Sequence, residues 1–275
     1  MTEILVVANR TIGGRPVLER VRELAKEPGT RFRLVVPAQR PGSGLVIYDD
    51  AVRDAAQVRV DLAVTFLRRE GIQVEGEVGD EDPFHATMDA IGERRPDQVI
   101  VSTLPATSSG WMRRDLIERI QQATGLPVEH VVVDLSEGLP MQTTLVIANK
   151  TSGGHELIDR LKEMAPDPQQ HVFILVMPLS DGGGRASWEA RGRLATVLDR
   201  LRNEGLVAAG MVGDPDPYTA AVNALDLFTV SSVVISTLPE EKSGWTRARL
   251  VERVRSASRV PVEHVVVPID DQVTA

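Results

Sequence analysis

The sequence predicts an α/β fold of two tandem, doubly wound five-stranded parallel sheets, each with strand order 3-2-1-4-5. Two observations predict this fold. Short runs of Val, Ile and Leu alternate with longer amphipathic stretches, the pattern of parallel strands buried on both faces and joined by helices. The chain is also a duplication, because residues 97–134 and 231–268 align without a gap and 20 of these 38 positions are identical.

The first half is predicted to contain five strands, at 3–8, 31–37, 72–78, 97–102 and 128–133. Helices are predicted near 14–26, 50–70, 83–94 and 110–124. Asp82-Pro83 marks the start of the third helix, since a capping carboxylate followed by proline is a typical helix beginning. Right-handed crossovers between parallel strands place helices on both faces of such a sheet, as in flavodoxin-like and Rossmann-like proteins.

The second half repeats this order, with strands near 144–148, 171–177, 206–212, 231–236 and 262–267. Residues 136–142 contain Gly138 and Pro140 and form the natural linker. We therefore predict one domain over 1–135 and a second over 141–275. A domain of this length buries about two-thirds of its unfolded surface without disulfides or metals.

Composition excludes several classes of protein and site. The chain has no cysteine, which excludes disulfides, thiolate metal sites and cysteine nucleophiles. Its net charge of −8 argues against nonspecific nucleic-acid binding, which depends on neutralising phosphates. No apolar run approaches the ~20 residues of a membrane span, and the first residues do not resemble a secretory signal. We expect a cytoplasmic protein with no nucleic-acid or membrane partner.

Sheets of this strand order bind ligands outside the carboxyl ends of their strands, where the order reverses, beside the loops after the first and fourth strands. The loops after the first strands contain Asn9-Arg10-Thr11 and Asn149-Lys150-Thr151, each followed closely by two glycines. Small polar residues before a helix leave backbone N–H groups for an anion, and Arg10 and Lys150 add positive charge. The alternative is a capped turn, in which Thr11 and Thr151, or the glycines, begin the helix.

The loops after the fourth strands begin with Ser102-Thr103 and Ser236-Thr237. They continue to Ser109-Gly110 and Ser243-Gly244, followed by Arg113 and Arg247. Hydroxyls at a strand end, a helix N-terminus and an arginine in its first turn would together hold a phosphate or carboxylate. In the alternative, the second serines cap the helix, the adjacent tryptophans are buried and the arginines lie in solvent.

Two histidines, His130 and His264, lie within the last strand of each half beside Glu129 and Glu263. Polar residues on an edge strand limit unwanted pairing, and this is the favoured interpretation. A metal site or a proton relay is the alternative. Arginines such as Arg94 are scattered among acids and are predicted to be solvated surface.

The tandem strands and their loops resemble the universal stress protein family in its two-domain form. The resemblance covers both halves almost completely. It depends on the element order, on the endings VIVSTLPATSSGW…LPVEHVVV and VVISTLPEEKSGW…VPVEHVVV, and on the GD-x-DP turn before the third helix. The resemblance implies a fold of the adenine-nucleotide-binding type, a role in stress tolerance and association through the last strand of each domain.

The chain departs from the ATP-binding branch of that family at its glycine motif. Ser102 and Pro105, or Ser236 and Pro239, occupy the first two glycine positions, and no glycine stands at 114–116 or 248–250. Side chains there obstruct the close backbone approach that glycine permits. Asn9 and Asn149 stand at the end of the first strand of each half, where the family commonly has an acidic residue. ATP and AMP are therefore only candidate ligands, and a smaller or differently held anion is the alternative.

The fifth strands, 128–133 and 262–267, are terminal in their sheets. We predict that they pair antiparallel, which would make the halves a pseudo-twofold dimer within one chain and leave edges for a second copy. The favoured function is a non-catalytic stress-response module that binds a nucleotide or other anionic ligand after strands one and four. A nucleotide hydrolase of low activity and a ligand-free interaction scaffold are the alternatives. No catalytic or metal-ligating residue is identified.

Overall fold

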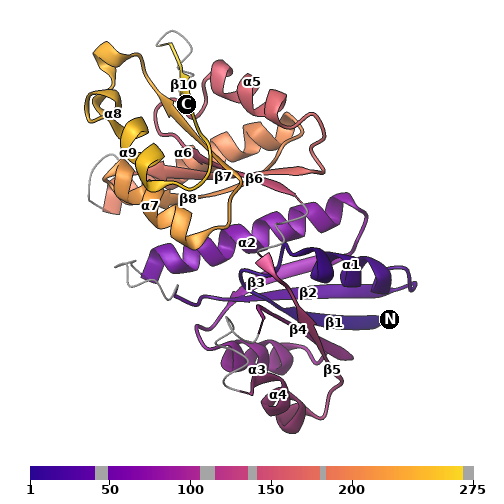
Figure 1. The fold of residues 1–275 in the computed structure, drawn as a ribbon. Helices are drawn as coiled ribbons and strands as arrows, with labels where there is room; N and C mark the ends of the chain where they lie inside the picture. Colours follow the sequence, from indigo (N-terminus) through magenta and orange to yellow (C-terminus); the bar gives the residue numbers. More distant parts are fainter. Residues whose placement is uncertain (41–48, 106–114, 136–140, 180–183, 269–275) are drawn as a thin grey trace. The chain divides into compact units, whose positions relative to one another are not determined.

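The computed structural model describes residues 1–40, 49–105, 115–135, 141–179 and 184–268. Within these ranges the chain forms two five-stranded sheets in which every strand pair is parallel. The strand orders are β3-β2-β1-β4-β5 and β8-β7-β6-β9-β10, and helices cover both faces of each sheet (Figure 1). The predicted fold class and strand order are confirmed.

The first sheet consists of β1 (Thr2–Val7), β2 (Thr30–Pro37), β3 (Val74–Gly79), β4 (Gln98–Thr103) and β5 (Val128–Val132). It is joined by α1 (Arg15–Leu24), α2 (Asp49–Arg69), α3 (Pro83–Glu93) and α4 (Leu116–Thr124). Apolar residues of β1, β2 and β4 pack against α3 and α4 in one core. Asp82 caps α3 as expected, because its carboxylate accepts hydrogen bonds from the backbone N–H groups of Phe84 and His85.

The second sheet consists of β6 (Gln142–Ile147), β7 (His171–Pro178), β8 (Val207–Gly213), β9 (Ser232–Thr237) and β10 (Val262–Val266). Its helices are α5 (His155–Met164), α6 (Gly184–Asn203), α7 (Pro217–Leu227), the 3-10 turn η3 (Glu240–Lys242), α8 (Gly244–Arg247) and α9 (Leu250–Ala257). Contacts divide the chain into two compact units, with the main division between Pro140 and Met141. None of the helices in the described ranges is long and apolar enough to cross a membrane.

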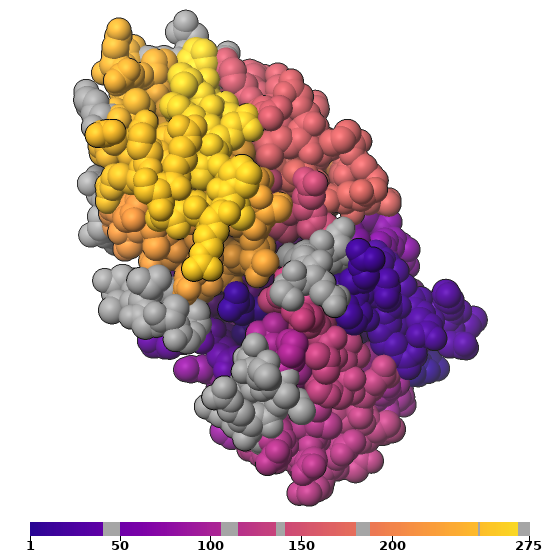
Figure 2. Space-filling model, viewed as in Figure 1, coloured from indigo at the N-terminus to yellow at the C-terminus, as the bar shows by residue number. Residues whose placement is uncertain are grey.

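The edge strands β5 and β10 are anchored in the same way in both units. Arg20 of α1 donates two hydrogen bonds, of 2.7 and 3.0 Å, to the carboxylate of Glu129. Arg160 of α5 forms the same pair of bonds with Glu263. The C-terminal segment that carries β10, coloured yellow, lies at the surface of the second unit (Figure 2). Pairing between β5 and β10 stays a prediction.

The last helical segment of the second unit is divided into two short helices, α8 and α9. Helix α8 ends at Arg247 and α9 begins at Leu250. Between them, Arg249 has a left-handed backbone with φ 53°, and its counterpart Asp115, just before α4, has φ 48°. A side chain in this conformation costs about 1–2 kcal/mol, because its Cβ crowds the following carbonyl.

We expect Arg249→Gly to raise the free energy of unfolding by about 0.5–1 kcal/mol, because relief of the left-handed strain exceeds the added chain entropy. Urea denaturation measures this change. Glu252→Gly, within α9, is the matched control and should lower stability by about 1 kcal/mol, the usual effect of glycine inside a helix. A loss of stability in Arg249→Gly would contradict the assignment of strain.

A buried histidine lies at the start of β7. The ring of His171 is within hydrogen-bond distance of Met164 O (Nδ1, 2.8 Å) and Thr144 Oγ1 (Nε2, 2.7 Å). Thr144 Oγ1 is 2.8 Å from Ser232 Oγ, so the network links three strands. Burial lowers the pKa of His171 below its usual value of 6.5, and the backbone bond to Met164 opposes that shift.

This shift makes stability depend on pH. The unfolded chain takes up a proton on His171 more readily than the folded chain, so this contribution is present above about pH 6.5 and is lost as pH falls through the folded-state pKa. We expect His171→Gln to cost about 1–2 kcal/mol at pH 7.5 and less at pH 5.5. Urea denaturation of both proteins at both pH values isolates the effect, and an equal difference at the two values would refute it.

Candidate anion site at the strand ends

The two loops that the sequence singles out are brought together in each unit. Strands β1 and β4 are neighbours, as are β6 and β9, so their carboxyl ends lie side by side. A hydrogen bond joins the loops directly: Thr11 Oγ1 donates to Ser102 O at 3.3 Å, and Thr151 Oγ1 donates to Ser236 O at 3.1 Å. The duplicated sequence thus builds the same junction twice.

The two asparagines tie the end of the first strand to the second. Asn9 Nδ2 donates to Pro37 O at 3.1 Å, and Asn149 Nδ2 donates to Pro178 O at 2.7 Å. Both side chains are buried. Their amide nitrogens are therefore occupied in holding adjacent strand ends in register, while Arg10 and Lys150 next to them are exposed.

The second glycine of the pair in the first loop serves packing. Gly14 and Gly154, and not the threonines, are the N-cap residues of α1 and α5. A Cβ on Gly154 would lie 2.3 Å from Val267 Cγ1, and one on Gly14 would lie 2.3 Å from Val133 Cγ1. The expectation that Thr11 and Thr151 begin the helix is wrong, because their hydroxyls are bonded to the neighbouring strand. The glycine alternative is correct.

The threonines after β4 and β9 contact the edge-strand histidines. Thr237 Oγ1 donates to Leu238 O at 2.9 Å and is 2.8 Å from His264 Nε2. If Thr237 donates to Leu238 O, Nε2 of His264 must be the protonated ring nitrogen and donate to Thr237. Thr103 and His130 repeat the arrangement, also at 2.8 Å. Burial lowers the pKa of both histidines, so they are neutral at pH 7.

The histidines lie on the terminal strands, as predicted, and each also contacts a threonine of the predicted site. Among the residues that the structure describes, no group of three or more His, Asp or Glu is placed to hold a metal ion. The hydroxyls of Ser102 and Ser236 are buried, and neither has a hydrogen-bond partner within the described chain.

The second part of the fourth-strand loop is described only in the second unit. Ser243 Oγ accepts a hydrogen bond from Thr246 N at 3.1 Å and so caps α8, as the alternative expected for the serine. Trp245, which the same alternative expected to be buried, is only half-buried. Gly244 is exposed, with open space around its Cα. Ser109, Gly110 and Arg113 lie outside the described residues, and so does the side chain of Arg247.

A cavity of about 300 Å³ lies between these loops in the second unit. Two of its lining residues are the lysines Lys150 and Lys242, and none of the described lining residues is acidic. The others are Asn149, Thr151, Leu179, Pro215, Ser236, Thr237, Leu238, Ser243, Gly244 and Trp245. Lys242 and Trp245 were not among the predicted site residues. Lys242 falls in the stretch where the two halves differ, so comparison of the halves hides it.

The sequence matches none of the protein-family models and none of the curated proteins with which it was compared. Among solved structures, the chain is similar to a universal stress protein from Archaeoglobus fulgidus, with 13% identity over 98% of this chain and 97% of that one, at a TM-score of 0.38. A universal stress family protein from Burkholderia pseudomallei shows 19% identity over 47% of this chain and 95% of that one, at a TM-score of 0.35. A functionally unknown protein from Pseudomonas aeruginosa shows 15% identity over 97% of this chain and 93% of that one, at a TM-score of 0.32.

Proposed function

We propose that the chain is a non-catalytic module of the stress-response type whose second unit binds a small anionic ligand in the cavity after β6 and β9. The observation that carries this proposal is that Lys150 and Lys242 both line a cavity whose described lining contains no acid. Two cations without a lining carboxylate give the cavity a positive potential, which favours a phosphate or carboxylate.

The neutral lining supports the same class of ligand. Thr151, Ser236 and Thr237 supply hydroxyl-bearing residues to the lining, and Trp245 also lines the cavity. Hydroxyl groups and ammonium groups together are typical partners of phosphate oxygens. An indole beside them offers a flat apolar surface to a ring or a short carbon chain.

The size and backbone of the site favour a ligand smaller than a wrapped triphosphate. Of the residues at 236–250, only Gly244 is a glycine. Pro239 and the left-handed Arg249 stand where the family resemblance would place glycines. Their side chains prevent the loop from following a phosphate chain closely. The site is therefore suited to one phosphate or carboxylate group on a compact body, such as a nucleoside monophosphate.

The second unit is the better candidate of the two. Arg10 corresponds to Lys150, but the counterpart of Lys242 is Ser108, so the first half lacks the second cation at that position. If each charge-assisted contact contributes about 1.5–3 kcal/mol, this single difference is large enough to make one site dominant.

Calorimetric titration with inorganic phosphate, AMP and ATP tests the proposal. We expect Lys150→Ala and Lys242→Ala each to weaken phosphate and AMP binding by about tenfold or more, with little change in stability, because both side chains are exposed. Lys26→Ala, an exposed lysine in the first unit, is the matched control and should bind as the unaltered protein does. Equal affinities in all four proteins, or no binding heat with any anion, would contradict the proposal.

Ser236→Ala separates stability from binding. The Ser236 hydroxyl is fully buried without a partner, so its removal should raise the free energy of unfolding by about 0.5–1 kcal/mol. If the bound anion supplies the missing partner, the same change weakens phosphate binding. Urea denaturation and calorimetry on this one variant should therefore move in opposite directions. A loss of stability with unchanged affinity would show that the hydroxyl serves the fold instead.

A further inference from the structure

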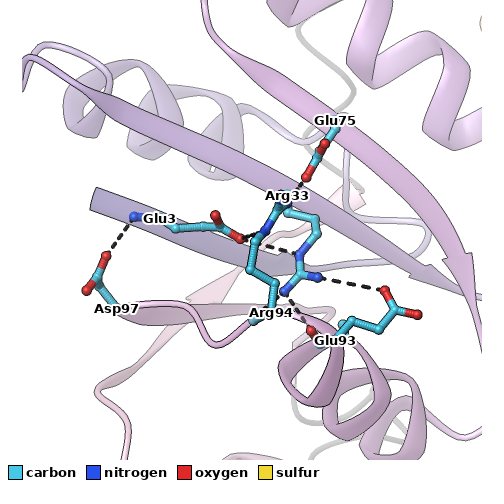
Figure 3. A network of polar contacts seen from close by, with 7 residues as sticks. Glu3, Arg33, Glu75, Glu93, Arg94 and Asp97 are labelled. Carbon is cyan, nitrogen blue, oxygen red and sulfur yellow. Dashed lines mark hydrogen bonds and ion pairs between the residues drawn. The ribbon is translucent and has the colours of Figure 1, made fainter. Parts of the chain in front are cut away.

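A second group of charges lies in the first unit, at the carboxyl end of α3 (Figure 3). It comprises Glu3, Arg33, Glu75, Glu77, Glu93 and Arg94, and we name it the Arg33 cluster. Arg33 lies within β2 and is only 5% exposed, although its side chain is charged. Its Nη2 donates to the carbonyl oxygens of Ala90 at 2.6 Å and Arg94 at 2.5 Å.

The pairing within the cluster leaves negative charge without a matching cation. Arg94 forms ion pairs with Glu3, at 2.5 Å, and with Glu75. Arg33 approaches Glu3 at 3.7 Å and Glu93 only at 4.0 Å. Four carboxylates thus face two guanidinium groups, and the excess falls on Glu77 and Glu93.

Two buried polar atoms of the cluster have no hydrogen-bond partner in the described chain, namely Glu77 Oε1 and Arg33 Nε. Burial raises the pKa of Glu77, the charge of Glu93 raises it further, and Arg33 opposes the shift. Glu77 therefore lacks a donor that would stabilise its ionised form. Arg33 Nε likewise forms no hydrogen bond within the described residues, although it lies 3.7 Å from Glu3 Oε1.

The second unit shows that the fold does not need these charges. Strand register matches Arg33 with Glu75 in β2–β3 and Ile174 with Ala209 in β7–β8. By the same correspondence, the counterparts of Arg33, Glu75, Glu77, Glu93 and Arg94 are Ile174, Ala209, Met211, Leu227 and Phe228, all of them buried. Apolar residues commonly replace buried ion pairs without loss of stability. A role other than folding therefore explains the Arg33 cluster better.

All members of the cluster except Glu3 line a cavity of about 410 Å³, together with Gly76. The side chain of Glu93 is 67% exposed and stands at the mouth, whereas the Glu77 oxygen is buried. We propose that this cavity binds a small organic cation, through an ammonium or guanidinium group that donates to Glu77 and is neutralised by Glu77 and Glu93. This site is separate from the anion site, which lies in the other unit.

The chemistry of the lining defines the ligand class. The ligand must carry an N–H donor, because the buried Glu77 Oε1 lacks a hydrogen-bond partner as well as a neutralising positive charge. A hydroxyl or carbonyl oxygen next to the cationic group would in turn accept from Arg33 Nε. A quaternary ammonium carries the charge but no N–H, so it satisfies only half of the site.

Calorimetric titration of the full chain with 1,4-diaminobutane and agmatine tests this proposal. We expect saturable binding of at least one of them, and Glu77→Gln, which keeps the shape of the side chain, should weaken it by about tenfold or more. Glu93→Gln at the exposed mouth should weaken it less. Glu27→Gln, an exposed acid of the same unit, and Lys242→Ala in the anion site should leave it unchanged.

Several results would overturn the proposal. One is the absence of saturable heat with either amine at millimolar concentration. Another is binding of the amines by Glu77→Gln and Glu93→Gln as tightly as by the unaltered chain. Binding of tetramethylammonium as tightly as the amines would show that charge alone is recognised, and binding of MgCl₂ but not of amines would assign a metal site instead. Because Glu93 is exposed, its variant is expected to fold even if Glu77→Gln does not.

Discussion

Gly154→Ala is expected to lower the free energy of unfolding by about 2–3 kcal/mol, the usual cost of forcing a methyl group into a closely packed site. The new Cβ would lie 2.3 Å from Val267 Cγ1 and 3.0 Å from Val267 Cγ2, so either α5 or the segment after β10 must shift. Gly154 is also the N-cap of α5, and its neighbouring backbone is fixed by a hydrogen bond from Gly154 N to Thr151 O at 3.1 Å. Urea denaturation at 25 °C measures the loss.

The adjacent glycine is the matched control. A Cβ on Gly153 would meet only Arg200 Nη1, at 3.8 Å, so Gly153→Ala should change stability by less than about 0.5 kcal/mol. Val267→Ala removes the methyl groups that cause the clash, and Gly154→Ala should cost less in that background than alone. Equal costs for the two glycines would show that the loop needs both for its backbone, as a phosphate-binding loop would.

Phe173→Ala is expected to have the largest effect on stability, a loss of about 3–5 kcal/mol. The ring is fully buried in the core between β7 and the helices α5 and α6. It also stacks on His171 with ring centroids 4.6 Å apart and planes inclined by 10°. Truncation therefore leaves a cavity and removes the packing that holds the buried imidazole.

Two variants bracket that result. Phe173→Leu keeps most of the volume and should cost about 1.5 kcal/mol or less if the site can repack. Trp188→Ala removes a larger ring that is 77% exposed, and should change stability by less than about 0.5 kcal/mol. If Trp188→Ala cost as much as Phe173→Ala, the assignment of the core to this face of the sheet would be wrong.

The fold could be predicted from the sequence because its signal is repeated and local. Each strand is a short apolar run, each crossover has a helical period, and the second half restates the first. The loops after β1, β4, β6 and β9 were found because the topology rule and the duplication pointed to the same residues. The junction between Thr151 and Ser236 follows directly from that reasoning.

Residues that distinguish the two halves could not be predicted from the duplication, because it points only to positions that the halves share. Lys242 stands where the first half has Ser108, and Arg33 stands where the second half has Ile174. A search for shared motifs passes over such positions. Arg94 is exposed, as predicted, but its ion pair with Glu3, 91 residues earlier in the chain, was not predicted. Contacts of that sequence separation depend on strand register, which periodicity alone does not supply.

The sequence left the start of the first helix open between Thr11 and the glycines for a related reason. Threonine is a typical N-cap residue, but the hydroxyl of Thr11 donates instead to the carbonyl of Ser102. That carbonyl comes within reach of Thr11 only after β1 and β4 have paired. Tertiary contact then decides which residue begins the helix. Gly14 takes that place because the side chain of Val133 leaves no room for a Cβ.

The anion site of the second unit is tested at the level of atoms by a crystal structure of the full chain grown with tungstate, a tetrahedral dianion whose tungsten gives an anomalous signal. The account predicts a tungsten peak inside the cavity, within contact distance of the ammonium groups of Lys150 and Lys242, that disappears in Lys242→Ala. A peak elsewhere on the chain with this cavity empty, or one unchanged by Lys242→Ala, would contradict it.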